Sequence, residues 1–171
     1  MAKCGGGFLT LLLLTTMTYT ASSFSIISVV LNRPKPAVEN IPTSPPTSRE
    51  LDLNVPSIRL SHASARGLNS LYTPRDPKTI PKGFIRACGK AGGFAPRPLW
   101  DDLTTGITPW FENDQGCFIY FNCNDANWWI DSEQGSGMYL AAHNGSLFLP
   151  PTDGWMNLTG ERAGVPKMTF D

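Results

Sequence analysis

The sequence has few of the residues on which most enzymes and metal sites depend. It contains two histidines and four cysteines in 171 residues, without any Cys-x-x-Cys spacing. Histidine is the usual general base near neutral pH, and zinc sites need clustered cysteine and histidine. The glycines between Gly89 and Gly93 lack the spacing of a phosphate-binding loop. These absences favour a protein that is not an enzyme and takes no cofactor or metal.

A long hydrophobic run is also missing. The apolar segment Phe8–Leu14 is too short to span a bilayer. Because Lys3 precedes it and the small residues Ala21–Ser23 follow it, residues 1–23 have the three-part layout of a secretory signal peptide. Together with Ile26–Leu31 the region approaches the about 20 residues of a membrane span, so a retained anchor is the alternative. A membrane is an expected partner only in that second case.

Residues 24–82 are predicted to be a transit-like or linker segment, mostly disordered. The segment is rich in Ser, Thr, Pro and Arg, and six prolines interrupt it between Asn32 and Leu60. Ile58–Ala63 alternates briefly, which would add one edge strand at most. The context Thr20–Ser25, with Phe24 directly after the expected cleavage point, resembles the bipartite presequence of algae with complex plastids. The two expected destinations on the secretory pathway are therefore a complex plastid and the outside of the cell.

Charge is unevenly distributed although the formal net charge is zero. Residues 83–171 contain ten acidic and five basic side chains, so the first 82 residues are basic. Phosphate binding needs clustered Lys and Arg. An acidic C-terminal part therefore argues against nucleic acid as its ligand.

Aromatic residues are concentrated near the C-terminus, where all five tryptophans fall between Trp100 and Trp155. Short aromatic runs separated by Gly, Asn and Asp are typical of strands joined by turns. We predict an all-β module over residues 83–171, a small antiparallel meander that forms a compact barrel or sandwich, preceded by a disordered N-terminal region. One helical turn is expected at Pro98–Leu103. The predicted strands are 84–88, 93–95, 108–112, 117–122, 127–131, 137–142 and 154–158.

Residues 84–158 resemble a short aromatic-rich β repeat module of algal and protist proteins. The resemblance is carried by Trp110-Phe111, Phe118–Phe121, Trp128-Trp129 and above all the closing Pro150–Trp155, which matches a Pro-Pro-x-x-Gly-Trp ending. It implies an accessory or binding unit without enzymatic residues. The family often uses tandem copies, whereas one copy is present here.

Two interpretations apply to the aromatic residues. Trp110, Trp129, Tyr139 and Trp155 are candidates for an exposed stacking platform that binds a protein or carbohydrate partner. The alternative is that the aromatic residues are core, because each contributes about 2 to 3 kcal/mol when buried.

Other candidate sites are cysteines and asparagines. Cys88 is a candidate for a disulfide with Cys117 or Cys123 in an oxidising compartment, and buried reduced thiols are the alternative. Asn144 and Asn157 begin Asn-x-Ser/Thr triplets and are candidate N-glycosylation sites. The resulting hypothesis is a non-enzymatic binding module, with a structural subunit of a larger assembly, plastid-based or not, as the alternative. A small Cys/His hydrolase built on Cys88 or Cys117 with His143 is a distant third.

Overall fold

The structure is a computed structural model that describes residues 55–160 and 164–171. The predicted signal peptide, residues 1–23, and the front of the predicted transit-like segment, residues 24–54, lie outside the described residues. The anchor and plastid-address hypotheses therefore stay predictions.

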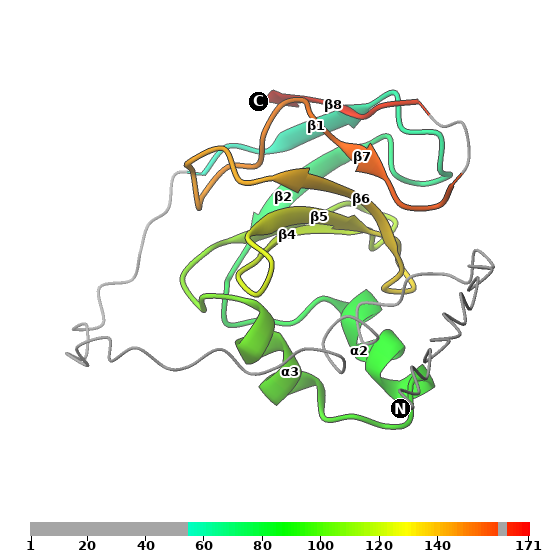
Figure 1. The fold of residues 1–171 in the computed structure, drawn as a ribbon, viewed down its shortest axis with the longest axis vertical. Coiled ribbons are helices and arrows are strands. Elements are labelled where there is room, and N and C mark those ends of the chain that lie inside the picture. The colour runs from blue at the N-terminus through cyan, green and yellow to red at the C-terminus, as the bar shows by residue number, and fades with distance from the viewer. Residues whose placement is uncertain (1–54, 161–163) are drawn as a thin grey trace, which may run out of the picture.

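The described chain forms one curled antiparallel sheet, a half-barrel, with two short helices at one end (Figure 1). The strand order is β7-β6-β5-β4-β3-β2-β1-β8. The all-β prediction is thus confirmed. The strands are β1 (Ile58–Ser61), β2 (Leu71–Arg75), β3 (Trp110–Glu112), β4 (Phe118–Asn122), β5 (Asn127–Asp131), β6 (Gly137–Ala142), β7 (Met156–Asn157) and β8 (Lys167–Phe170).

The centre of the sheet is a meander from β3 to β6, as predicted. Each strand pairs antiparallel with the next, and β4 is buried at every position because both of its faces are covered. The turn from β3 to β4 is closed by Asn113, whose side-chain oxygen accepts the backbone N–H groups of Gln115 and Cys117. These Asn-based turns are local, which explains why their positions can be predicted from sequence.

The predicted strand at Phe84–Cys88 is wrong, because this segment lies in helix α2 (Lys82–Lys90). Its buried side chains, Phe84, Ala87 and Cys88, are spaced three and four residues apart, which is a helical period. No strand forms at Gly93–Ala95 either, since Gly92 and Gly93 have φ values of 117° and 75° that end the helix in a loop. Helix α3 (Pro96–Leu103) contains the predicted helical turn, with proline in its first turn.

The predicted module boundary at Gly83 is also wrong. Residues 55–82 were assigned to a disordered linker, yet they contain β1 and β2. β1 lies between β2 and β8, so it is an interior strand of the sheet, not an edge strand. Ile58 and Tyr72 are fully buried because they fill the concave side of the half-barrel. Adding residues 55–82 brings five basic side chains to the folded part, which therefore has a nearly balanced charge and is not acidic.

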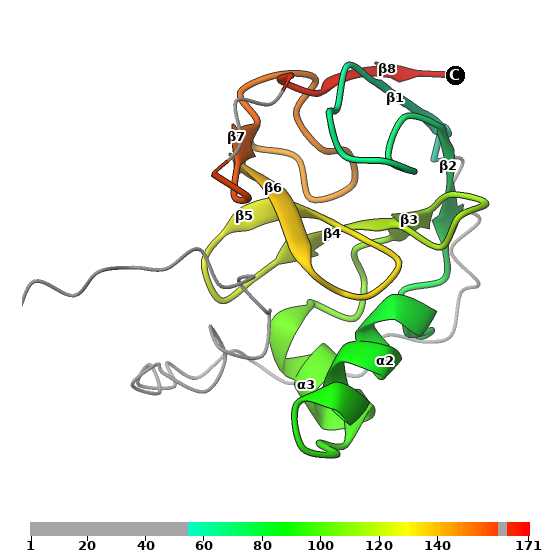
Figure 2. The ribbon, with the colours of Figure 1, turned by 90° about the vertical axis from the view of Figure 1, so that its right-hand side faces the viewer.

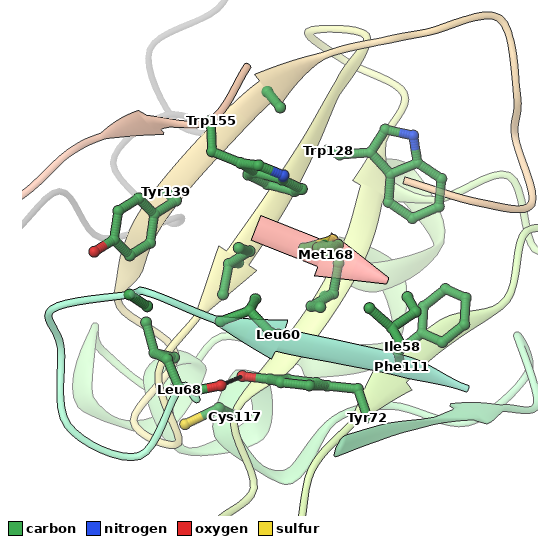
Figure 3. Close-up of a cluster of buried hydrophobic side chains, with 14 of the residues drawn as sticks. Ile58, Leu60, Leu68, Tyr72, Phe111, Cys117, Trp128, Tyr139, Trp155 and Met168 are labelled. Atoms are coloured by element: carbon green, nitrogen blue, oxygen red, sulfur yellow. Dashed lines mark hydrogen bonds between the residues drawn. The ribbon is translucent and has the colours of Figure 1, made fainter. Parts of the chain in front are cut away.

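Two hydrophobic clusters lie on opposite faces of the sheet. The first fills the half-barrel, where side chains from β1, β2, β5, β6 and β8 point toward one another (Figure 3). The second lies between the sheet and the two helices, which cover one end of the molecule (Figure 2). Trp100 of α3 is at its centre, with its ring centroid 5.0 Å from that of Phe84 and 5.2 Å from that of Tyr120. Both faces of the sheet are therefore covered by hydrophobic side chains. On one face the outer surface is formed by the two helices.

Candidate functional site

The four aromatic residues predicted to form an exposed platform are buried. Trp110, Trp129, Tyr139 and Trp155 have exposed fractions of 4%, 5%, 1% and 4%. They are also divided between the two clusters, since Tyr139 and Trp155 point into the half-barrel (Figure 3) while Trp110 and Trp129 face the helices. The platform prediction is therefore wrong, and the core interpretation holds for these side chains.

Their polar atoms are used inside the fold as well. The indole N–H groups donate to Asp76 O from Trp110, to Asp125 Oδ2 from Trp129 and to Pro151 O from Trp155, each at 3.0 Å. The Tyr139 hydroxyl lies 3.0 Å from Ser64 Oγ. Tryptophan and tyrosine usually find such partners when buried. Because ring faces and polar tips are both occupied, none of the four is available to stack on a sugar or peptide.

The predicted disulfide is absent: Cys88, Cys117 and Cys123 are all free. Cys88 belongs to the cluster under the helices and Cys117 to the cluster inside the half-barrel, so the sheet separates them. The exposed Cys123 thiol donates to Asp102 O at 3.5 Å. A disulfide between neighbouring strands is excluded, because Cys88 lies in helix α2 on the outer face of the sheet and not in a strand.

The thiols also lack the environment of a nucleophile. Burial raises the pKa of Cys117 to about 11 and raises the pKa of Cys88 and of Cys123 as well. Reactive cysteines have lowered pKa values instead. The imidazole of His143 lies tilted against the ring of Phe121, with ring centroids 5.1 Å apart, and no thiol in the described residues bonds to a histidine. This geometry gives no support to a Cys/His hydrolase.

Three polar groups are buried without a partner in the cluster under the helices. These are the carboxyl of Asp131, the hydroxyl of Tyr120 and the indole N–H of Trp100. Burial raises the pKa of Asp131 well above its ordinary range, so the neutral acid is favoured. Burial, and next the nearby Asp131, raises the pKa of Tyr120. All three groups are enclosed by the fold and cannot reach a ligand. We therefore expect them to affect the stability of the protein and not its binding.

The exposed face of α2 is the most distinctive surface of the described chain. Lys82, Arg86 and Lys90 are exposed and follow one another at intervals of four residues, about 6 Å along a helix axis. Exposed apolar side chains occur on the same helix and on the loop after it: Ile85 is 46% exposed, and Phe94 is 37% exposed. We call these five residues the α2 face.

No acidic side chain balances the α2 face from nearby in sequence, because residues 77–100 contain five basic residues and no acidic one. The salt bridges in the described ranges, 55–160 and 164–171, are Arg59–Asp171, Arg75–Glu112 and Arg97–Asp101, and none includes the helix. Arg86 Nη1 donates to Glu133 O at 2.8 Å, and Lys90 Nζ donates to Gln134 Oε1 at 2.6 Å. These bonds fix the helix to the β5–β6 turn, and no carboxylate of the described residues forms a salt bridge with its cations.

A shallow hollow of about 300 Å³ lies where α2 meets this turn, lined by Ala87, Lys90, Ala91, Gln134, Gly135 and Ser136. Gly135 has φ 74°, and a Cβ there would lie 2.6 Å from the carbonyl oxygen of Gly83. Glycine is therefore required for the turn to approach the helix this closely. With one ammonium and one amide at its wall, the hollow suits a carboxylate side chain of a docked segment.

Sequence reasoning missed the α2 face because the segment was divided between a predicted linker and a predicted strand. The four-residue spacing of Lys82, Arg86 and Lys90 was the available signal. Combined with the helical spacing of Phe84, Ala87 and Cys88 on the opposite side, it indicates an amphipathic helix.

The predicted glycosylation sites fall in different settings. Asn144 lies in the exposed loop after β6, and Asn157 lies in the edge strand β7, where it is partly buried.

No three His, Cys, Asp or Glu side chains gather as a metal site would require, within the part of the chain that the structure describes. Neither described helix is long and apolar enough to cross a membrane. Comparisons with protein-family models, with curated proteins and with solved structures found no match to this chain.

Proposed function

We propose that residues 55–171 form a non-enzymatic binding module that docks an acidic segment of a partner protein on the α2 face. The observation that carries the proposal is the row of three exposed cations, Lys82, Arg86 and Lys90, none of which forms a salt bridge within the described residues, together with exposed Ile85 on the same helix and Phe94 in the loop after it. Charge complementarity steers association and sets register, while apolar anchors supply contact area. A partner segment that combines carboxylates with apolar side chains fits both features.

A protein partner is favoured over a glycan partner. Glycan recognition was expected from Trp110, Trp129, Tyr139 and Trp155, all of which are buried. The α2 face instead presents three cations with Ile85 and Phe94, and one of these cations, Lys90, lies at the wall of the hollow. Carboxylates are the natural counterpart of such a surface.

The test uses a fluorescent synthetic peptide in which glutamate alternates with leucine, and a control peptide in which glutamine replaces glutamate. Binding to the full chain is followed by anisotropy at low and at physiological salt. The triple substitution Lys82→Glu, Arg86→Glu and Lys90→Glu should weaken binding by about tenfold or more, equivalent to about 1.4 kcal/mol. Affinity should also fall as salt rises, because exposed charges are screened.

The matched control reverses three exposed cations at the β1 and β8 end, Arg59→Glu, Arg66→Glu and Lys167→Glu. It changes net charge equally and should leave most of the affinity intact. Equal loss in both triple variants would show that only net charge matters, and absence of wild-type binding to the acidic peptide would reject the docking site. Binding to immobilised glycans that survives the α2 reversal would favour the glycan version.

A structural subunit of a larger assembly, plastid-based or not, is the second candidate. It is favoured by the burial of every tryptophan at 5% exposure or less, which leaves no tryptophan of the described residues exposed for stacking on a ligand. In this version residues 32–54 dock the module into the assembly. Their deletion should abolish co-migration with the native complex while leaving the β-sheet intact, and retained co-migration would reject this role. The deletion must stop before Val55, because β1 and β2 belong to the sheet.

The proposed route to either destination is the secretory pathway, through residues 1–23. Fusing residues 1–54 to a fluorescent reporter distinguishes the alternatives: a plastid signal, a secreted reporter or a membrane-retained one. A reporter that stays in the cytosol would reject the leader.

A further inference from the structure

Two Asn-x-Ser/Thr triplets lie in the folded part, at Asn144-Gly145-Ser146 and at Asn157-Leu158-Thr159. Both fit the same Asn-x-Ser/Thr pattern, so the sequence does not distinguish them. Neither triplet takes part in the docking role proposed for the α2 face. Their surroundings in the fold differ at the one atom that matters for N-glycosylation, the side-chain amide nitrogen Nδ2.

Asn144 is presented on a loop that is open to solvent but held at both ends. Asn144 and Gly145 are exposed, and a Cβ placed on Gly145 would meet nothing within 4 Å. His143 N donates to Ala126 O at 3.3 Å on one side, and Ser146 Oγ accepts the N–H of Leu149 at 3.1 Å on the other. Asn144 Oδ1 accepts the N–H of Ser146 at 3.0 Å, so the oxygen is occupied and the amide nitrogen is not used in that bond.

The side-chain amide nitrogen of Asn157 is buried by the fold. It lies in β7 opposite Tyr139 of β6, and its Nδ2 is buried without a hydrogen-bond partner. Its Oδ1 accepts both the N–H of Thr159 at 2.6 Å and the hydroxyl of Thr159 at 2.8 Å. A sugar attached to Nδ2 would need volume that neighbouring atoms already occupy, because Nδ2 is buried. Strand β7 would then have to leave β6.

We propose that the folded protein carries a single N-linked oligosaccharide, on Asn144, and that Asn157 stays unmodified. The donor is an oligosaccharide linked to a lipid pyrophosphate in the endoplasmic reticulum. Asn144 Nδ2 forms a bond to the anomeric carbon of the first sugar, the bond from that carbon to the pyrophosphate oxygen breaks, and Nδ2 loses one proton as the lipid pyrophosphate leaves. No electrons are transferred, and the amide is retained. Because the enzyme acts on the emerging chain, molecules modified at Asn157 would be unable to complete β7 and would be lost from the folded pool.

The test expresses the full chain in a secretory eukaryotic cell and recovers the folded protein. Treatment with peptide N-glycosidase in ¹⁸O-water converts each glycosylated asparagine to labelled aspartate, which peptide mass spectrometry locates. The label is expected on residue 144 alone, with the apparent mass on a gel falling by one step on deglycosylation. Asn144→Gln should abolish the glycan, whereas Asn157→Gln should keep it.

A variant that retains the modification controls for misfolding of the loop. Ser146→Thr preserves the hydroxyl that the triplet requires, and it should keep the glycan on Asn144. Label on residue 157 of the folded protein, loss of the glycan in Asn157→Gln, loss in Ser146→Thr, or no label at either asparagine would each overturn the proposal. These readouts do not involve the α2 face, so they are independent of the docking role.

Discussion

At the scale of single residues, the cost of burying polar atoms separates the proposed docking surface from the core. Asp131 and Tyr120 are buried without hydrogen-bond partners, and an unsatisfied buried polar group costs about 1 to 3 kcal/mol. The cations of α2 stay exposed, where they keep their hydration and remain able to meet a partner. The first set therefore tunes stability, and the second set is free to bind.

Asp131→Asn is predicted to stabilise the protein at neutral pH. Burial raises the pKa of Asp131 above the ordinary value of 3.8, so the folded state holds a proton that the unfolded state releases. The free energy of unfolding should therefore fall as pH rises above about 4 and level off beyond the folded-state pKa. Asparagine cannot ionise, so the variant should lose this slope and gain about 1 kcal/mol or more at pH 7.

The measurement is urea unfolding of both proteins between pH 4 and pH 8. Asp153→Asn, which removes an exposed carboxylate from a loop, controls for the lost charge and should preserve the wild-type slope. If the wild type and Asp131→Asn respond identically to pH, the carboxyl has a partner or water that satisfies it in the ionised form.

Gly135→Ala is predicted to destabilise the fold through a direct collision. The added Cβ would lie 2.6 Å from Gly83 O and 2.7 Å from Ala87 Cβ, and φ at this position is 74°. Overpacking costs about 1 to 3 kcal/mol, and the positive φ adds about 1 to 2 kcal/mol. Gly154→Ala is the matched control, since φ is 78° there and nothing lies within 4 Å.

The difference between the two glycine variants, measured by thermal unfolding, isolates the collision from the backbone strain. Gly135→Ala should be the less stable by about 1 to 3 kcal/mol. Equal losses would mean that the turn moves away from α2 freely, which would also weaken the case for a fixed hollow beside Lys90.

Residue identity predicted the core better than it predicted the site. Large aromatic side chains favour burial, and the structure buries all four platform candidates. The sequence alone did not show which elements would cover these side chains. Helices α2 and α3 bury Trp110 and Trp129, and the half-barrel buries Tyr139 and Trp155. Both coverings depend on contacts between residues distant in sequence.

At the scale of elements, the predictions that held were those marked by local turn residues. Those that failed depended on the spacing of apolar side chains along the chain. The strands from β3 to β7 and the helical turn in α3 were predicted because Asn, Asp, Gly and Pro mark their ends locally. Helix α2 was missed because Phe84–Cys88 was assigned to a strand and the residues before Gly83 to a proline-rich linker, which divided the helix between the two. β8 was missed because Lys167–Phe170 has one buried side chain and little apolar signal.

β8 nevertheless closes the half-barrel, so Met168→Ala is predicted to be destabilising. Met168 is 3% exposed, pairs with Leu60 of β1, and donates its backbone N–H to Thr152 O at 3.1 Å. Truncating a buried methionine costs about 2 to 5 kcal/mol. Denaturant unfolding should show this loss, while Lys167→Ala, one position away and exposed, should change stability by about 0.5 kcal/mol or less. A small effect at Met168 would mean that β8 docks only loosely.

At the scale of the whole molecule, fold class was predictable and the domain boundary was not. An all-β antiparallel meander follows from local patterning, and the structure has that architecture. The N-terminal limit depends on whether Ile58, Leu60, Leu68 and Tyr72 find a core, which only the curled sheet supplies. Proline-rich surroundings hid these residues, because six prolines just before them favour disorder.

The final prediction follows from this boundary: a fragment of residues 55–171 should fold, and a fragment of residues 83–171 should not. The shorter fragment loses β1, β2 and the loop between them, and with these the four large buried side chains Ile58, Leu60, Leu68 and Tyr72. Each contributes about 1.5 to 3 kcal/mol, a total of about 6 to 12 kcal/mol. Domains of this size are stable by only about 5 to 15 kcal/mol.

The loss also leaves β8 without β1, its partner along four residues, and exposes the edge of β3. Both fragments are compared by near-ultraviolet circular dichroism and thermal unfolding. The longer one should show a tryptophan signal and a cooperative transition, because its buried tryptophans sit in fixed surroundings. The shorter one should show neither, and a cooperative transition in residues 83–171 would mean that β3 to β7 and the helices are a self-sufficient core to which β1, β2 and β8 merely add.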